Sequence, residues 1–159
     1  MWLPASTRPS QAGFEPGETE SIMVGRADAL ASDVPLPAGV TLRRVTEEDD
    51  VRAMAAMQDE AFGDSPSELS AVGILRRVAL DDGMELWVAE VDGAMVSAGR
   101  LEPVAGTEFA GLWGGATLAP WRRRGIYRAL TAARARSALA KGKRLVHSDS
   151  TEYSRPILE

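Results

Sequence analysis

A cluster of arginines around one glycine is the part of this sequence whose residue types are best suited to chemistry. Residues 122–128 read Arg-Arg-Arg-Gly-Ile-Tyr-Arg, shortly after Pro120 and at the start of apolar residues that recur at helical spacing. Such a helix begins with backbone N–H groups that have no partner inside the helix, and its dipole favours negative charge there. Arginine side chains add charge-assisted hydrogen bonds. The segment therefore predicts an anion site suited to phosphate.

The same residues resemble motif A of the GNAT acyltransferases, which use acyl-coenzyme A. The family signature is Gln/Arg-x-x-Gly-x-Gly/Ala, and Tyr127 stands at its last position, where the family has glycine or alanine. The resemblance covers residues 39–159 and implies acetyl-CoA as cosubstrate. The coenzyme site that it implies consists of a strand end and the turn after it, namely Thr117, Leu118, Arg122, Arg123, Arg124, Gly125, Ile126, Tyr127 and Arg128.

The chemistry that the resemblance implies is acyl transfer to an amine by direct attack in a ternary complex. This reaction needs a neutral amine, a polarised thioester carbonyl and a thiolate that leaves, usually protonated. Many family members place a tyrosine near the coenzyme sulfur as general acid. Leu158 stands at that position here, so Tyr153 is the substitute candidate. The candidates for general base are Glu108, because some members use a strand carboxylate, and His147, because imidazole titrates near neutral pH.

Several of these residues also fit plainer roles. Glu108 is consistent with a solvated turn residue, and His147 with a packed strand residue. Residues 113–115 read Trp-Gly-Gly, which is unusual inside a strand because glycine weakens it unless something approaches closely. A substrate or cofactor that approaches this segment is one explanation, and a bulge or tight packing against Trp113 is the other; both are open. Four basic residues of the expected long helix fit a solvated face: Arg134, Arg136, Lys141 and Lys143.

The elements that must position these residues follow from hydrophobic periodicity and turn signals. The expected strands are residues 40–45, 84–91, 94–104, 109–118 and 144–148, and the expected helices are residues 47–62, 67–80, 126–140 and 154–159. Thr46 and Asp49 predict a capping box, and Asp92-Gly93 predicts a hairpin. The order matches the GNAT fold, a mixed α/β (α+β) sheet in which an antiparallel meander precedes a parallel, right-handed β-α-β unit, with helices on both faces. In that family the first two helices line the acceptor cleft.

The first 36 residues are expected to be an N-terminal extension and linker before a domain at 37–159, with Pro35 and Pro37 as linker signals. The family continues with two closing strands, and this sequence ends before them. Gly13-Phe14, followed by a candidate strand at 18–24, is similar to such a closing segment. Two accounts remain open. The segment is a loosely packed remnant of a preceding domain, or it pairs with the sheet beyond residues 144–148, in its own chain or in a homodimer.

Composition limits the remaining function classes. The 159 residues fit a single domain, and the absence of cysteine excludes disulfides, thiolate catalysis and cysteine-ligated metals. With one histidine, no metal cofactor is expected. No apolar run reaches the length of a membrane span and no signal peptide is recognised, so we expect no membrane association and a cytoplasmic location. The net charge of −5 hides an asymmetry, since residues 122–144 hold nine of the 18 Lys and Arg and none of the 23 acidic residues. This pattern favours a local anionic ligand.

The leading hypothesis is a transferase, an N-acetyltransferase that acts on a small-molecule or peptide amine. The alternative is a non-catalytic acyl-CoA-binding or regulatory module, favoured by Leu158 and by the short end. A third hypothesis, nucleic-acid binding through the basic helix, lacks an identifiable motif or a stacking platform. The acidic balance of the whole chain also opposes it, so we expect no nucleic acid partner.

Overall fold

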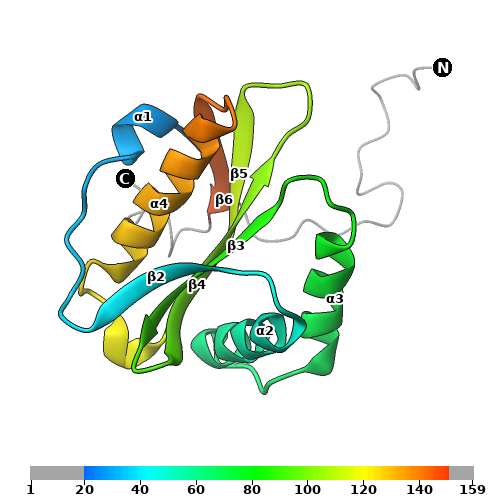
Figure 1. The fold of residues 1–159 in the computed structure, drawn as a ribbon, viewed down its shortest axis with the longest axis vertical. Coiled ribbons are helices and arrows are strands. Elements are labelled where there is room, and N and C mark those ends of the chain that lie inside the picture. Colours follow the sequence, from blue (N-terminus) through cyan, green and yellow to red (C-terminus); the bar gives the residue numbers. More distant parts are fainter. Residues whose placement is uncertain (1–19, 151–159) are drawn as a thin grey trace. The chain divides into compact units, whose positions relative to one another are not determined.

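The computed structural model describes residues 20–150, in which helices cover both faces of a six-stranded sheet (Figure 1). The strands are β1 Ser21–Arg26, β2 Val40–Val45, β3 Glu85–Val91, β4 Ala94–Pro103, β5 Phe109–Thr117 and β6 Leu145–Ser150. The helices are α1 Ala27–Leu30, α2 Glu48–Phe62, α3 Glu68–Val78 and α4 Ile126–Ala140, with a short 3-10 helix at Ala119–Trp121. The chain divides into two compact units, and the larger, Val24–Ser148, contains the helices and the meander.

The strand order β1-β6-β5-β4-β3-β2 confirms the predicted mixed sheet. Strands β2 to β5 form an antiparallel meander, while β5 and β6 are parallel. Parallel neighbours need a crossover connection, which α4 provides. Helices α2 and α3 lie on one side of the sheet and α1 and α4 on the other (Figure 1).

The predicted hairpin between β3 and β4 is confirmed. Asp92 and Gly93 both adopt positive φ, 49° and 80°, which matches a two-residue turn whose twist suits the flanking strands. The register runs from Val91 opposite Ala94 to Glu85 opposite Leu101. This turn fixes how β4 lies beside β3 and therefore where the side chains of β4 face.

Helix α4 has the predicted bounds, Ile126–Ala140. Gly125 precedes it with φ 79° and Gly142 follows it with φ 75°, a backbone conformation that glycine adopts without strain. Ile126 and Leu130 are buried against the sheet. Small side chains on the same helix allow it to pack closely, namely Ala129, Ala132, Ala133, Ala135 and Ala138.

The start of α2 differs from the prediction. Glu47, and not Thr46, is the N-cap residue, and its side chain makes no capping hydrogen bond. The Thr46 hydroxyl donates instead to the Glu47 carboxylate. The predicted capping box is therefore wrong. Three acidic residues in the first turn, Glu48, Asp49 and Asp50, complement the helix dipole in its place.

The two outer elements next to the parallel pair also differ in extent. The last described strand, β6, begins at Leu145 and runs to Ser150, beyond the expected end at residue 148. The candidate strand at 18–24 corresponds to β1, Ser21–Arg26, which neighbours β6 in the sheet order. After it, the Ala27 N–H donates to the Arg144 carbonyl at 2.9 Å, and Ala27 is fully buried. The expected helix at 154–159 lies outside the described residues.

Candidate active site

The basic turn, residues 122–125, presents a row of unused backbone donors. Gly125 is the N-cap of α4 and no side chain caps it. The N–H groups of residues 123–128 donate no hydrogen bond within the part of the chain that the structure describes. Consecutive free N–H groups at a helix start form an anion-binding concavity. The basic turn therefore offers backbone donors of the kind that a phosphate needs.

The arginine side chains of this turn differ in what they contact. The Arg122 guanidinium donates to the Thr117 carbonyl and to the Ala61 carbonyl, both at 2.9 Å, so it ties the turn to β5 and α2. The Arg124 guanidinium lies 4.8 Å from the Trp121 ring centroid, a cation–π contact. Arg123 has φ 60°, and no side-chain hydrogen bond is found for it or for Arg128 among the described residues. Two of the four guanidinium groups are thus free to meet an anion.

The parallel strands β5 and β6 pair over a short stretch only. Their register runs from Phe109 opposite Leu145 to Gly111 opposite His147, although β5 continues to Thr117. The side chain of Trp113 lies at the point where pairing ends, with its ring 5.3 Å from the His147 ring in an edge-on arrangement. The two strands therefore separate toward the end of β5 that leads into the basic turn, and no strand of residues 20–150 pairs with β5 on that side beyond Gly111.

A β-bulge in β5 adjoins this opening. Ala98 pairs with Ala116 and Arg100 pairs with Trp113, so Gly99 alone faces two β5 residues, Gly114 and Gly115. Gly114 adopts φ 60°, which explains the glycine at this position. The side-chain amide of Gln58, which is buried on α2, donates to the Gly114 carbonyl at 2.6 Å. Of the two accounts left open for residues 113–115, the bulge is present, and it brings backbone polar groups to the surface of a cavity.

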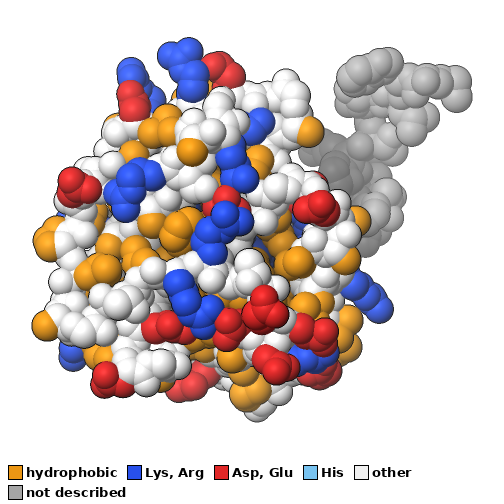
Figure 2. All heavy atoms as spheres, viewed as in Figure 1, with side chains coloured by type: hydrophobic (Ala, Val, Ile, Leu, Met, Phe, Trp, Pro, Cys, Tyr) orange, Lys and Arg blue, Asp and Glu red, His pale blue; other side chains and the backbone are white. Residues whose placement is uncertain are grey.

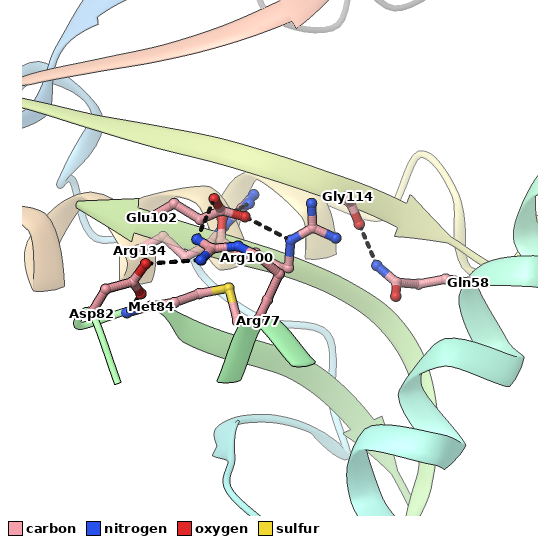
Figure 3. A network of polar contacts seen from close by, with 8 residues as sticks. All are labelled: Gln58, Arg77, Asp82, Met84, Arg100, Glu102, Gly114 and Arg134. Atoms are coloured by element: carbon pink, nitrogen blue, oxygen red, sulfur yellow. Dashed lines mark hydrogen bonds and ion pairs between the residues drawn. The ribbon is translucent and has the colours of Figure 1, made fainter. Parts of the chain in front are cut away.

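That cavity, which we call the Arg100 cavity, has a volume of about 560 Å³. It lies between α2, α3, β4 and the bulge. Figure 3 shows Glu102 between Arg77 and Arg100, and beside them the separate bond from Gln58 to Gly114. The lining residues are Gln58, Asp59, Phe62, Leu69, Ser70, Gly73, Ile74, Arg77, Arg100, Glu102, Trp113 and Gly114. A mixture of exposed apolar side chains and a few converging polar groups is typical of a ligand site.

A smaller cavity of about 390 Å³ lies on the other side of α2. Its one cation, Arg43, bridges Asp50 and Glu90 at 2.6 Å each. Those hydrogen bonds raise the pKa of Arg43 and lower the pKa of the Asp50 carboxyl. Acidic side chains gather on the surface over α2 (Figure 2), where the first turn of the helix carries them. The cation of the smaller cavity is thus already paired with two carboxylates of the described residues.

The half-buried Tyr127 contacts the fully buried Arg134 on α4. The Arg134 side chain is fully buried, so its predicted place on a solvated face is wrong. Its guanidinium donates to the Arg100 carbonyl at 3.1 Å and lies 5.6 Å from the Tyr127 ring centroid. Burial lowers the pKa of the Arg134 guanidinium, and the charge and hydrogen bond of Tyr127 oppose that shift. A Cβ added to Gly115 would lie 2.6 Å from the Tyr127 Cε2 atom, so the tyrosine ring covers the glycine.

The other basic residues expected on the solvated face of α4 have partners. Lys141 forms an ion pair with the buried Glu85 at 3.2 Å. Lys143 donates to the carbonyls of Val104 and Thr107 at 2.8 and 2.7 Å. Arg136 is closest to the expectation, because half its side chain is exposed and it donates to a backbone carbonyl in the linker before β2.

The structure brings some of the predicted site residues together and separates others. Thr117 ends β5 and shares a hydrogen bond with Ser97 at 2.8 Å, while Leu118 donates its N–H to Val96. Ile126 is buried in the core, so only its N–H faces the turn. The base candidate Glu108 is exposed at the opposite end of β5 from the basic turn, with Arg144 at 3.5 Å. His147 lies at the strand separation, and Tyr153 lies outside the described residues.

Two polar residues of the site were missed by the sequence analysis. Gln58 occupies the apolar stripe of α2, and a polar side chain on such a stripe is a usable signal of a buried hydrogen bond. Arg100 lies in the middle of β4 between buried neighbours, but a single sequence does not show which residues of β5 will lie beside it. Both positions depend on the bulge in β5, which only the three-dimensional register reveals.

The described residues contain no group of three or more His, Cys, Asp and Glu side chains that could hold a metal ion. Among the described helices, none is long and apolar enough to span a bilayer. No protein-family model matches the sequence, and no curated protein matches it.

Solved structures with this fold are numerous. A tandem GNAT protein from the clavulanic acid biosynthesis pathway superposes with a TM-score of 0.71 at 17% identity, covering 98% of this chain and 55% of that one. A GCN5-related N-acetyltransferase from Sphaerobacter thermophilus gives a TM-score of 0.68 at 24% identity, covering 90% and 46% of the two chains. AAC(6')-Iy, in complex with the bisubstrate analogue CoA-S-monomethyl-acetylneamine, gives 0.62 at 18% identity, covering 74% and 86%. The chain has the GNAT fold, as predicted, and it spans about half the length of the first two proteins.

Proposed function

We propose that this chain is a GNAT-type N-acyltransferase that transfers an acetyl group from acetyl-CoA to an amine by direct attack in a ternary complex. The observation that carries the proposal is the row of unpartnered N–H groups at residues 123–128, set between free arginine side chains at the start of α4. A diphosphate matches such a row in charge and in its demand for hydrogen bonds. The fold shared with a protein whose structure contains a coenzyme A analogue supports the same ligand.

The separated ends of β5 and β6 suit an extended arm that runs from the basic turn toward the bulge. Beyond Gly111, no strand in the described part of the chain pairs with β5 on that side, so its backbone groups can hydrogen-bond a ligand as another strand would. Acyl-CoA supplies the acyl group as an activated thioester. At the bulge, fixed backbone dipoles around Gly114 and Gly115 are suited to polarise its carbonyl, and Gln58 holds the Gly114 peptide in place.

The amine approaches from the Arg100 cavity, which opens on the other side of the bulge. In the transfer step the amine nitrogen forms a bond to the acyl carbon, the carbon–sulfur bond breaks, and the proton lost by the amine ends on the thiol. The chain contributes chiefly by holding the two reactants in position, which lowers barriers by about 7–11 kcal/mol in well-oriented reactions. The cavity carboxylates are engaged: Asp59 accepts from Ser67 and Ser70, and Glu102 accepts from two arginines. Proton transfer through solvent is therefore part of the proposal, with His147 the base candidate that lies nearest the strand separation.

A second function, a non-catalytic acyl-CoA-binding module, is favoured by the place of Tyr127. Its ring covers Gly115 on the strand that would carry the arm of the coenzyme, where the GNAT signature has glycine or alanine. Such a module would bind acetyl-CoA but release no thiol with any amine. The two functions therefore differ in turnover and not in binding.

The test compares two glycine variants by calorimetry with acetyl-CoA. Gly125→Glu places bulk and negative charge at the N-terminus of α4, so we expect coenzyme affinity to fall at least tenfold. Gly142→Glu is the matched control, because Gly142 has nearly the same φ, 75° against 79°, and lies past the other end of the helix. Equal affinity of the two variants would show that the basic turn does not hold the diphosphate. Release of free thiol on adding amines then separates transferase from binding module.

A further inference from the structure

The guanidinium of Arg100 uses one of its five N–H groups within the described residues. Its Nε donates to the Glu102 carboxylate at 3.0 Å, while its two terminal nitrogens make no hydrogen bond with any described residue. Figure 3 shows these two nitrogens on the side of the guanidinium that faces Gly114 and Gln58. A Cβ added to Gly114 would lie 3.1 Å from Arg100 Nη1, which confirms how closely the group approaches the bulge.

The neighbouring charges leave these donors available and do not compete for them. Glu102 is shared between Arg100 and Arg77, and the second terminal nitrogen of Arg77 pairs with Asp82 at 2.9 Å. Two cations and two carboxylates therefore balance in charge. What remains unsatisfied among the described residues is the pair of terminal nitrogens of Arg100, which carry four N–H groups, two of them parallel along the end edge of the guanidinium. That edge matches a carboxylate in a bidentate arrangement better than any other common group.

Exposed apolar side chains line the same cavity. Phe62 is 62% exposed and Leu69 is 82% exposed, unusually open for residues of their size. Both line the Arg100 cavity together with the half-buried Trp113. A ligand that fills the cavity would cover these side chains while one polar end reaches the arginine.

We propose that the Arg100 cavity binds a small amine that carries a carboxylate and an apolar side chain, an apolar amino acid being the simplest case. The two terminal nitrogens of Arg100 hold the carboxylate, Phe62 and Leu69 cover the side chain, and the amine faces the bulge at Gly114. This inference rests on the proposed acyl transfer, since it names the acceptor class. It predicts that a polycationic amine binds poorly, because it would leave the free edge of Arg100 unpaired and bring like charge to it.

A binding experiment isolates the carboxylate. N-acetyl-L-leucine and N-acetyl-L-leucinamide have the same shape and differ in the charged group, and each is titrated calorimetrically into the full chain. We expect the carboxylate probe to bind at least tenfold more tightly to the wild type. The difference should disappear in Arg100→Gln, shrink in Arg100→Lys, which keeps charge but loses the planar fork, and persist in Arg76→Gln. Arg76 is the charge-matched control because it is exposed on α3 and does not line the cavity. Thermal melting shows whether each variant is folded.

Two further measurements separate this inference from the proposed function. If acetyl-CoA binds and thiol is released as fast with leucinamide or a polycationic amine as with leucine, the acceptor class is wrong while acyl transfer stands. If acetyl-CoA does not bind but the carboxylate probe binds through Arg100, the transferase proposal fails while the carboxylate site at Arg100 stands. Failure of the carboxylate probe to bind the wild type, or unchanged binding in Arg100→Gln, overturns the inference.

Discussion

Addition of a single methyl group at Gly99 tests the packing under the sheet. Gly99 lies in β4 opposite Trp87, and a Cβ built on it would lie 2.7 Å from Arg134 Cζ. The guanidinium cannot easily retreat, because it is fully buried and donates to the Arg100 carbonyl and the Thr131 hydroxyl at 3.1 and 3.2 Å. Overpacking a filled core costs about 1–3 kcal/mol. Displacing a hydrogen bond to a charged group adds about 1.5–3 kcal/mol.

We therefore expect Gly99→Ala to lower the free energy of unfolding by about 3 kcal/mol. In the Arg134→Met background the guanidinium is gone, so the same methyl group should cost less than about 1 kcal/mol. The coupling energy between the two changes is then about 2 kcal/mol. Urea unfolding of the four proteins measures it. Gly73→Ala is the control, because a Cβ there meets nothing within 4 Å on helix α3, and it should stabilise the protein by about 0.5–1 kcal/mol. Costs that add to within about 0.5 kcal/mol would refute the argument, because the methyl group and the guanidinium would then not be in contact.

Three other changes have expected outcomes. Burial raises the pKa of the Glu85 carboxyl, but hydrogen bonds from Ser137, Trp87 and Lys141 outweigh burial, and the net pKa is lowered. The charged carboxylate therefore stabilises the folded protein above about pH 4.5, and this stability is lost as the pH falls through the pKa of Glu85 in the folded state. Thermal melting of Glu85→Gln should show a smaller loss between pH 5 and about pH 3 than the wild type, and an identical acid slope would contradict this. Deletion of residues 1–30 removes β1 and the buried Ala27, so the melting temperature should drop; a shortened protein with the same melting temperature and association state would show that the segment does not complete the fold. Tyr153→Phe should leave thiol release with an amine unchanged, because the proposal uses no tyrosine acid, and abolished turnover with intact coenzyme affinity would contradict it.

The parts of the fold that were predicted correctly from the sequence are those marked by nearby residues, such as glycines at helix ends, apolar repeats and turn residues. Helix α4 had both ends marked by glycine and a clear apolar repeat, and its bounds were predicted to the residue. Strand β2 and the hairpin at Asp92-Gly93 were equally well marked. Local backbone preference and local burial agree at these places, so a single sequence is sufficient.

The errors arose where a contact between distant elements overrides local pattern. A charged residue on a basic helix is expected in water, yet Arg134 is buried because the glycine at position 99 leaves room for its guanidinium. The bulge at Gly114 depends on how β4 and β5 align, and it is this alignment that brings Arg100 to the cavity. The basic turn was predicted from residue types, while the Arg100 cavity became visible only when the strands were placed side by side.

The guanidinium of Arg122 connects the basic turn to the helix that lines the Arg100 cavity, so ligand binding at the two places can be coupled. It joins the Thr117 carbonyl at the end of β5 to the Ala61 carbonyl in the last turn of α2, the same helix that lines the Arg100 cavity. An anion that draws this side chain into the turn must break the bond to Ala61 and release that end of α2. Thermodynamic linkage is reciprocal. If a ligand in the turn changes affinity in the cavity by some factor, a ligand in the cavity changes affinity at the turn by the same factor. Titration of either ligand in the presence of the other measures that factor, and Arg122→Ala sets it to one if this side chain alone transmits the coupling.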